Sequence, residues 1–128
     1  MSLAFDHVAI AARTLDEGAA WLAGWVMRAT PLRAPAGTRV VQARRGDLSW
    51  QITLPLAGQM PRDGAQPMLI DWGDGPHPSD RLPDRGVRLT RLTLPLDRLE
   101  LDDRRLMLTG AGTPLTATLA TPDGEVTL

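Results

Sequence analysis

Residues 48–54 alternate strictly between apolar and polar side chains. This period of two is that of a β-strand with one buried face. The apolar face holds Leu48, Trp50, Ile52 and Leu54, and the polar face holds Ser49, Gln51 and Thr53. A turn at residues 45–47 and a strand pattern over 38–44 precede it, so a hairpin is predicted over 38–54.

Further strands are predicted over residues 3–11, 68–72, 87–94, 115–120 and 125–128. In the strand over 87–94, Val87 and Leu89 share one face while Leu92 and Leu94 share the other. A β-bulge near Thr90 or Arg91 would reconcile the two phases. Pro122-Asp123-Gly124 is predicted to be the turn before the last strand.

Two helices are expected. Thr14 followed by Glu17 has the spacing of a capping box, and apolar residues recur at helical spacing up to Val26, which predicts a helix from residue 14. Residues 99–108 are interpreted as a short helix that ends at Gly110, with a strand as the alternative.

The element order is therefore β-α-β-β-β, a proline-rich loop over 73–86, then β-(α)-β-β. This order predicts one α+β domain over residues 1–128 with approximate halves 1–74 and 75–128. The halves are two βαβββ-type modules forming a curled mixed sheet, and the second module is degenerate.

Composition excludes several kinds of function. The 128 residues contain no cysteine, so disulfides, thiolate metal sites and a cysteine nucleophile are excluded. The net charge is −1, and the 14 basic residues, all arginine, are scattered, so no nucleic-acid partner is expected. No apolar run is long enough to span a membrane and no signal peptide is recognisable, which predicts a cytoplasmic protein without a membrane partner.

Three segments resemble the vicinal oxygen chelate (VOC) superfamily. The first is Phe5-Asp6-His7-Val8-Ala9-Ile10 followed by Arg13-Thr14-Leu15-Asp16, which is similar to the opening of these domains. The second, residues 67–87, resembles an uncharacterised glyoxalase-like branch, and Thr121-Pro122-Asp123-Gly124 resembles the turn before the family's last strand. The resemblance implies a sheet curled into a cup with a ligand site inside, and frequent pairing into homodimers.

Metal-dependent members of the superfamily take a histidine from the first strand, another from the strand that opens the second half, and acidic residues from the strands that end each half. Here His7 matches, whereas the strand over 87–92 has no histidine and Leu128 stands where a glutamate is expected. His7 and Asp71 remain candidate ligands for a divalent metal. Because catalytic metal sites need about three protein ligands, no cofactor is predicted.

The residues expected to bind a ligand are polar or aromatic side chains on the cup-facing positions and in the central loop. They are His7, Gln51, Thr53, Asp71, Trp72, His77 and Arg91. Several of them have an alternative structural role: His7 could bond within the sheet, Trp72 could pack in the core, and Arg91 could face solvent. His77, Ser79 and Asp80 are not interpreted as a nucleophilic triad, because triads assemble from distant segments and adjacent residues cannot adopt their geometry.

Three functions stay open, and the sequence does not decide whether the protein is an enzyme. The first is a domain that binds a small organic molecule without a complete metal site. The second is a metal-dependent lyase or isomerase of VOC type. The third is a non-catalytic homodimeric interaction module that pairs through a sheet edge or through Trp21 and Trp25.

Overall fold

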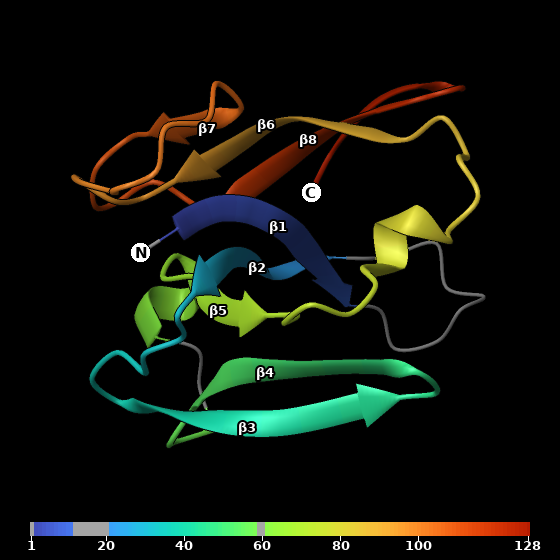
Figure 1. The fold of residues 1–128 in the computed structure, drawn as a ribbon. Helices are drawn as coiled ribbons and strands as arrows, with labels where there is room; N and C mark the ends of the chain where they lie inside the picture. The colour runs from blue at the N-terminus through green and yellow to red at the C-terminus, as the bar shows by residue number, and fades with distance from the viewer. Residues whose placement is uncertain (1, 12–20, 59–60) are drawn as a thin grey trace.

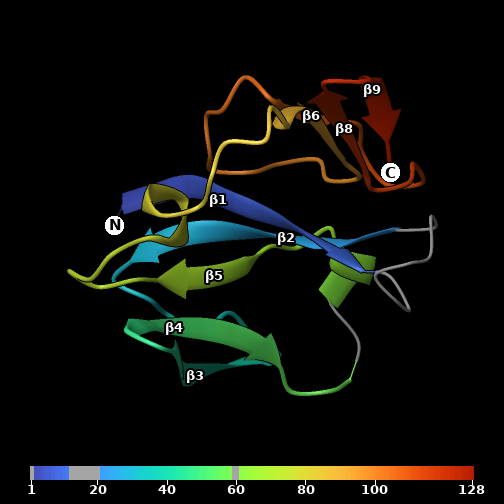
Figure 2. The same ribbon diagram turned by 90° about the vertical axis from the view of Figure 1, so that its right-hand side faces the viewer.

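The computed structural model describes residues 2–11, 21–58 and 61–128, which form two mixed β-sheets and almost no helix (Figures 1 and 2). Two short 3-10 helices, η1 (Pro61–Gly64) and η2 (Pro78–Asp80), are the helical elements of this part of the chain. The described residues include no helix with the length and apolar character needed to cross a membrane.

The first sheet contains five strands. Their spatial order is β1 (Ser2–Ala11), β2 (Trp21–Thr30), β5 (Met68–Asp71), β4 (Leu48–Pro55) and β3 (Thr38–Arg45). Strands β2 and β5 are parallel and the other neighbours are antiparallel. The predicted hairpin is confirmed as β3–β4, in which Arg45 pairs with Leu48 and Gly46 occupies the turn with a φ of 60°.

The second sheet contains four strands. Their order is β7 (Leu106–Leu108), β6 (Arg88–Leu94), β8 (Thr116–Thr121) and β9 (Gly124–Thr127). The predicted turn at Pro122 and Asp123 joins β8 to β9, because Thr121 pairs with Gly124. The segment from β5 to β6 runs from one sheet to the other along the right-hand side of Figure 1 and contains η2.

The core lies between the two sheets. Trp25 and Met27 on β2 pack with Leu92 and Leu94 on β6 and Ala117 on β8, all buried. The indole Nε1 of Trp25 donates a hydrogen bond of 2.8 Å to the carbonyl oxygen of Ala65. Trp25 is therefore not available to an interface between chains, which was one of the two pairing surfaces predicted; the side chain of Trp21 lies outside what the structure describes.

The helix predicted over residues 14–26 is wrong from Trp21 onward, where the chain forms β2. Residues 12–20, which include Thr14 and Glu17, lie outside the described residues. Strand β2 lies between β1 and β5, and both of its faces are covered: Trp25 and Val26 are each 0% exposed. A strand buried on both faces gives a continuous apolar run, which periodicity alone does not distinguish from a buried helix.

The interpretation of residues 99–108 as a helix is also wrong, and the alternative of a strand holds for Leu106–Leu108. Leu99 and Leu101 pack against the core from an irregular segment. The βαβββ modules of the predicted α+β class are thus not confirmed, and the described residues are mostly β.

The first strands of the two halves share a β-bulge. In β6 the register shifts between Leu89 and Arg91, which confirms the bulge predicted near Thr90. In β1 the register shifts between Phe5 and His7 in the same way, so Asp6 is the extra residue. The likeness that the sequence indicated between the two halves therefore extends to this irregularity of the backbone.

Candidate functional site

A cavity of about 720 Å³ lies against the first sheet, on the face opposite the core, and the segment around η2 closes one side of it. We refer to it as the sheet pocket. Its polar lining residues are Asp6, His7, Arg45, His77 and Ser79. Its apolar lining residues are Leu48, Trp50, Ile52, Ile70, Trp72, Pro78 and Leu82.

The bulge in β1 directs two neighbouring polar side chains into this pocket. Phe5 and Val8 both pack against the core, although an uninterrupted strand would place residues three apart on opposite faces. The extra residue at Asp6 restores the alternation and leaves Asp6 and His7 together in the pocket lining. Re-aiming side chains is a recurrent use of β-bulges near functional sites.

The carboxylate of Asp6 accepts hydrogen bonds from four side chains. Its Oδ1 accepts from Nδ1 of His7 at 2.6 Å. Its Oδ2 accepts from Nε2 of His77 at 3.1 Å, from Nε of Arg28 at 3.2 Å and from Nε1 of Trp72 at 3.2 Å. The side chain of Asp6 is 0% exposed, so the sequence-distant segments that carry these donors meet at one buried anion.

The electrostatics of this cluster keep Asp6 ionised. Burial acts to raise the pKa of Asp6, but hydrogen bonds from the two histidines and the arginine outweigh it and lower the pKa from 3.8 to about 2. A carboxylate that accepts several hydrogen bonds in its charged form behaves in this way. Asp6 is therefore a fixed negative charge at the base of the pocket at neutral pH.

The orientation of His77 is determined from both ring nitrogens. His77 caps η2, and its Nδ1 accepts a hydrogen bond of 3.1 Å from the backbone N–H of Ser79. Because that backbone group can only donate, Nδ1 carries no proton and Nε2 donates to Asp6. The hydroxyl of Ser79 lies 2.7 Å from the same Nδ1 and shares this acceptor with the backbone N–H.

The apolar wall of the pocket is built by β4, β5 and Trp72, which directly follows β5. The ring centroids of Trp50 and Trp72 are 5.2 Å apart, and those of Trp72 and His77 are 5.1 Å apart in an edge-on arrangement. These tryptophans therefore line the pocket beside the polar cluster, whereas packing in the core was the alternative that the sequence left open. Aromatic walls of this kind suit flat ligands.

The structure brings His7, Trp72 and His77 together in this pocket, out of the seven residues that the sequence indicated. Gln51 and Asp71 are cross-strand partners that line a smaller hollow of about 200 Å³ instead. Thr53 is buried, and its Oγ1 accepts a hydrogen bond of 2.8 Å from the backbone N–H of Leu69. Arg91 is exposed on β6 in the second sheet.

The alternation in β4 was predicted correctly, but the face that meets the pocket was not. We expected the polar face, Gln51 and Thr53, to line the cup, whereas the apolar face with Trp50 and Ile52 does so. Sequence reasoning also missed Asp6, Arg28 and Arg45. Asp6 was within the quoted motif, and the signal for its bulge is the change of apolar phase from Leu3 and Phe5 to Val8 and Ile10, which was not interpreted.

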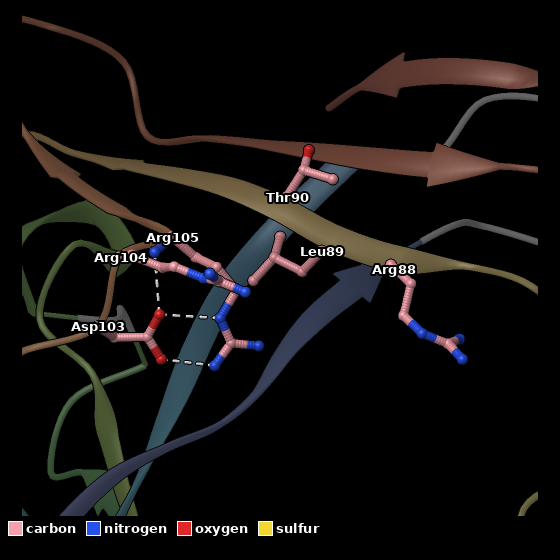
Figure 3. Close-up of a pocket in the computed structure, with 6 residues that line it drawn as sticks. All are labelled: Arg88, Leu89, Thr90, Asp103, Arg104 and Arg105. Carbon is pink, nitrogen blue, oxygen red and sulfur yellow. Dashed lines mark hydrogen bonds and ion pairs between the residues drawn. The ribbon is translucent and has the colours of Figure 1, made fainter.

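A second cavity of about 740 Å³ lies between β6 and the segment before β7 (Figure 3). Arg105 donates to Asp103 at 2.9 and 2.5 Å, and its guanidinium lies 4.4 Å from the centroid of the Phe5 ring. Arg88, which also lines this cavity, pairs with Asp84 at 2.6 Å. Because the sheet pocket combines a buried polar cluster with an aromatic wall, we place the candidate site there.

The metal ligands considered from the sequence do not share a site. Asp71 accepts a hydrogen bond of 2.8 Å from the backbone N–H of Gly73, while His7 bonds to Asp6 in the sheet pocket. Within residues 2–11, 21–58 and 61–128, no group of three or more His, Asp or Glu side chains is arranged to hold a metal ion.

Comparison with known families places this arrangement in context. The family model for the glyoxalase-like domain matches residues 27–106, which is more than half of the chain. The chain therefore belongs to the glyoxalase-like domain family, within the VOC superfamily. Comparisons with curated proteins and with solved structures gave no match.

Proposed function

We propose that this glyoxalase-like domain binds a small organic molecule in the sheet pocket, and that the ligand has a flat apolar body and an anionic group. The observation that carries the proposal is the combination of the Trp50 and Trp72 wall with the buried cluster around Asp6 in one cavity of about 720 Å³. Pockets that are mostly apolar and contain a few convergent polar groups are the usual form of small-molecule sites.

The charges of the lining support an anionic ligand. Among the described residues that line the pocket, Asp6 is the sole carboxylate, and Arg28 pairs with it at 3.2 Å. Arg45, at the end of β3, adds a further positive charge to the lining. A guanidinium binds a carboxylate through paired charge-assisted hydrogen bonds, which a neutral amide does not provide.

The test compares 2-naphthoate with 2-naphthamide by calorimetry and by thermal shift. We expect the acid to bind more tightly than the amide, and we expect Arg45→Leu to remove this preference. Trp50→Ala should weaken both ligands by about tenfold or more, because it removes much of the aromatic wall. Gln51→Ala, next to Trp50 on the opposite face of β4, is the matched control and should bind as the wild type does.

Two results would contradict the proposal. One is that neither compound, nor a wider set of planar acids, stabilises the protein. The other is that Trp50→Ala and Gln51→Ala bind equally well, which would place any binding outside the sheet pocket.

A further inference from the structure

Three side chains of the sheet pocket are connected in the order hydroxyl, imidazole, carboxylate. The Oγ of Ser79 lies 2.7 Å from Nδ1 of His77, and Nε2 of His77 lies 3.1 Å from Oδ2 of Asp6. Both distances are within hydrogen-bond reach. The carboxylate comes from β1, 71 residues from His77, so it is not part of the local cluster around η2.

The direction of these bonds is that of an activated serine. The amide of Ser79 donates to Nδ1 of His77, so this nitrogen is unprotonated, and the hydroxyl 2.7 Å away shares its single lone pair with that amide. The proton on Nε2 points to Asp6, a buried carboxylate whose pKa is lowered to about 2. Such a carboxylate fixes the tautomer of the imidazole and stabilises the imidazolium that forms when it takes a proton.

Position and access are also suitable. Ser79 is exposed and lines the sheet pocket, whereas the side chain of His77 is 20% exposed and that of Asp6 is 0% exposed. The nucleophile is thus open to a ligand, and the groups behind it are progressively shielded from water. Asp80 does not replace Asp6, since its Oδ2 accepts from the backbone N–H of His77 at 3.4 Å as part of the cap.

We propose that Ser79, His77 and Asp6 form a site for acyl transfer, in which Ser79 is the nucleophile, His77 the general base and Asp6 a positioning residue. The substrate class is an ester of a small carboxylic acid whose flat part contacts the tryptophan wall. The proposal rests on the proposed function only in requiring that the sheet pocket admits a small organic molecule.

The reaction consists of two balanced steps. In the first, Oγ of Ser79 forms a bond to the ester carbonyl carbon and its proton passes to Nδ1 of His77. The bond between that carbon and the alkoxide oxygen breaks, and the alkoxide leaves with the proton from His77. In the second step water attacks the acyl-serine, His77 accepts its proton and returns a proton to Ser79, and the carboxylic acid is released.

The experiment treats the full chain with a fluorophosphonate, which forms a bond to an activated serine oxygen and expels fluoride, and maps the label by mass spectrometry. We expect labelling at Ser79 and an initial burst of p-nitrophenol from p-nitrophenyl acetate. Ser79→Ala should abolish both. Ser49→Ala is the matched control, because Ser49 is exposed on β4, bonds to Gln42 at 3.0 Å and lies outside the sheet pocket lining.

Two further variants separate catalysis from folding. His77→Asn retains a side-chain oxygen that can cap η2 but lacks a base, so labelling should fall by about 10²-fold or more. Because this variant also loses the bond to Asp6, the rate is compared in samples that circular dichroism shows to be folded. Asp6→Asn should lower the labelling rate at saturating probe by at least about tenfold without raising the half-saturating concentration. A role of Asp6 in stability alone would not change this rate in folded protein.

Labelling that is absent, that falls on another residue, or that is equal in His77→Asn and the wild type would overturn the proposal. The naphthoate experiment distinguishes this failure from a failure of the proposed function. If 2-naphthoate binds in the sheet pocket and Ser79 is not labelled, the pocket is a binding site without acyl transfer. If neither occurs, both proposals are wrong.

Discussion

Asp6 is the residue on which the site depends. A buried carboxylate is costly unless charged or hydrogen-bonding partners surround it, and here His7, Arg28 and His77 meet that requirement together. The partners come from β1, β2 and the segment before β6, so the same bonds that hold the anion also hold the η2 segment against the first sheet. Ligand binding and local stability are therefore coupled at this carboxylate.

The lowered pKa of Asp6 predicts a pH dependence of stability. The pKa of Asp6 is about 2 in the folded protein, against the ordinary value of 3.8 that applies to the unfolded chain. The stabilising contribution of the ionised carboxylate is therefore complete above about pH 5 and is lost as the pH falls through 2. Its size is about 2 kcal/mol in the free energy of unfolding. Urea unfolding between pH 7 and pH 2 measures it.

Asp6→Asn is the comparison for that prediction. The variant should be less stable than the wild type at neutral pH, and the difference between the two should shrink on acidification. Asp103 also has a pKa lowered to about 2, through its bond to Arg105, and it contributes equally to both proteins. A difference that stays constant from pH 7 to pH 2 would show that Asp6 is not held as an anion.

At the scale of elements, alternating patterns predicted the strands well. The β3–β4 hairpin, its turn at Gly46, the bulge in β6 and the β8–β9 turn all follow from spacing and turn residues. β2 could not be recognised, because it is covered on both faces and its apolar run also fits a helix. The bulge in β1 was missed although Leu3 and Phe5, followed by Val8 and Ile10, show the same change of apolar phase as β6.

The turn at Gly46 provides a prediction at this scale. Its φ of 60° is in the left-handed region, and a Cβ added there would meet no atom within 4 Å, so the cost of a substitution is backbone strain alone. Gly46→Ala should lower the free energy of unfolding by about 1 kcal/mol. Gly46→Asn should cost less, since asparagine adopts this conformation more readily.

Denaturant unfolding of both variants checks the prediction. Equal stability of the wild type and Gly46→Ala would contradict the left-handed turn between β3 and β4, and with it the register that places Arg45 and Leu48 in the sheet pocket. The comparison is informative because the Cβ of either residue meets no neighbouring atom, so the two variants differ in how readily they adopt the left-handed backbone conformation.

At the scale of the whole molecule, the two sheets have separate roles. The face that β1, β2 and β5 share with the second sheet forms the core, and the opposite face carries the sheet pocket. The second sheet covers the core side of the first sheet. Arg88 on β6 and Arg105, directly before β7, are paired with Asp84 and Asp103. This division leaves β3 as an edge strand, with Val40 41% exposed.

Homodimer formation remains a prediction from the family resemblance, and the unpaired edge of β3 is a suitable surface for it because edge strands expose unpaired backbone groups. Sedimentation velocity at micromolar concentration should show a dimer. Val40→Arg, which adds a charge on this edge, should shift the protein toward a monomer. A monomeric wild type would contradict the prediction and would leave the sheet pocket as a property of the single chain.

The most direct test of the sheet pocket as the functional site is a crystal structure of the protein with 2-naphthoate. We predict that the ring contacts Trp50 and Trp72 and that the carboxylate lies within hydrogen-bond distance of Arg45. A naphthoate bound between Arg88 and Arg104, in the cavity of Figure 3, would contradict this account and would move the site to the second sheet.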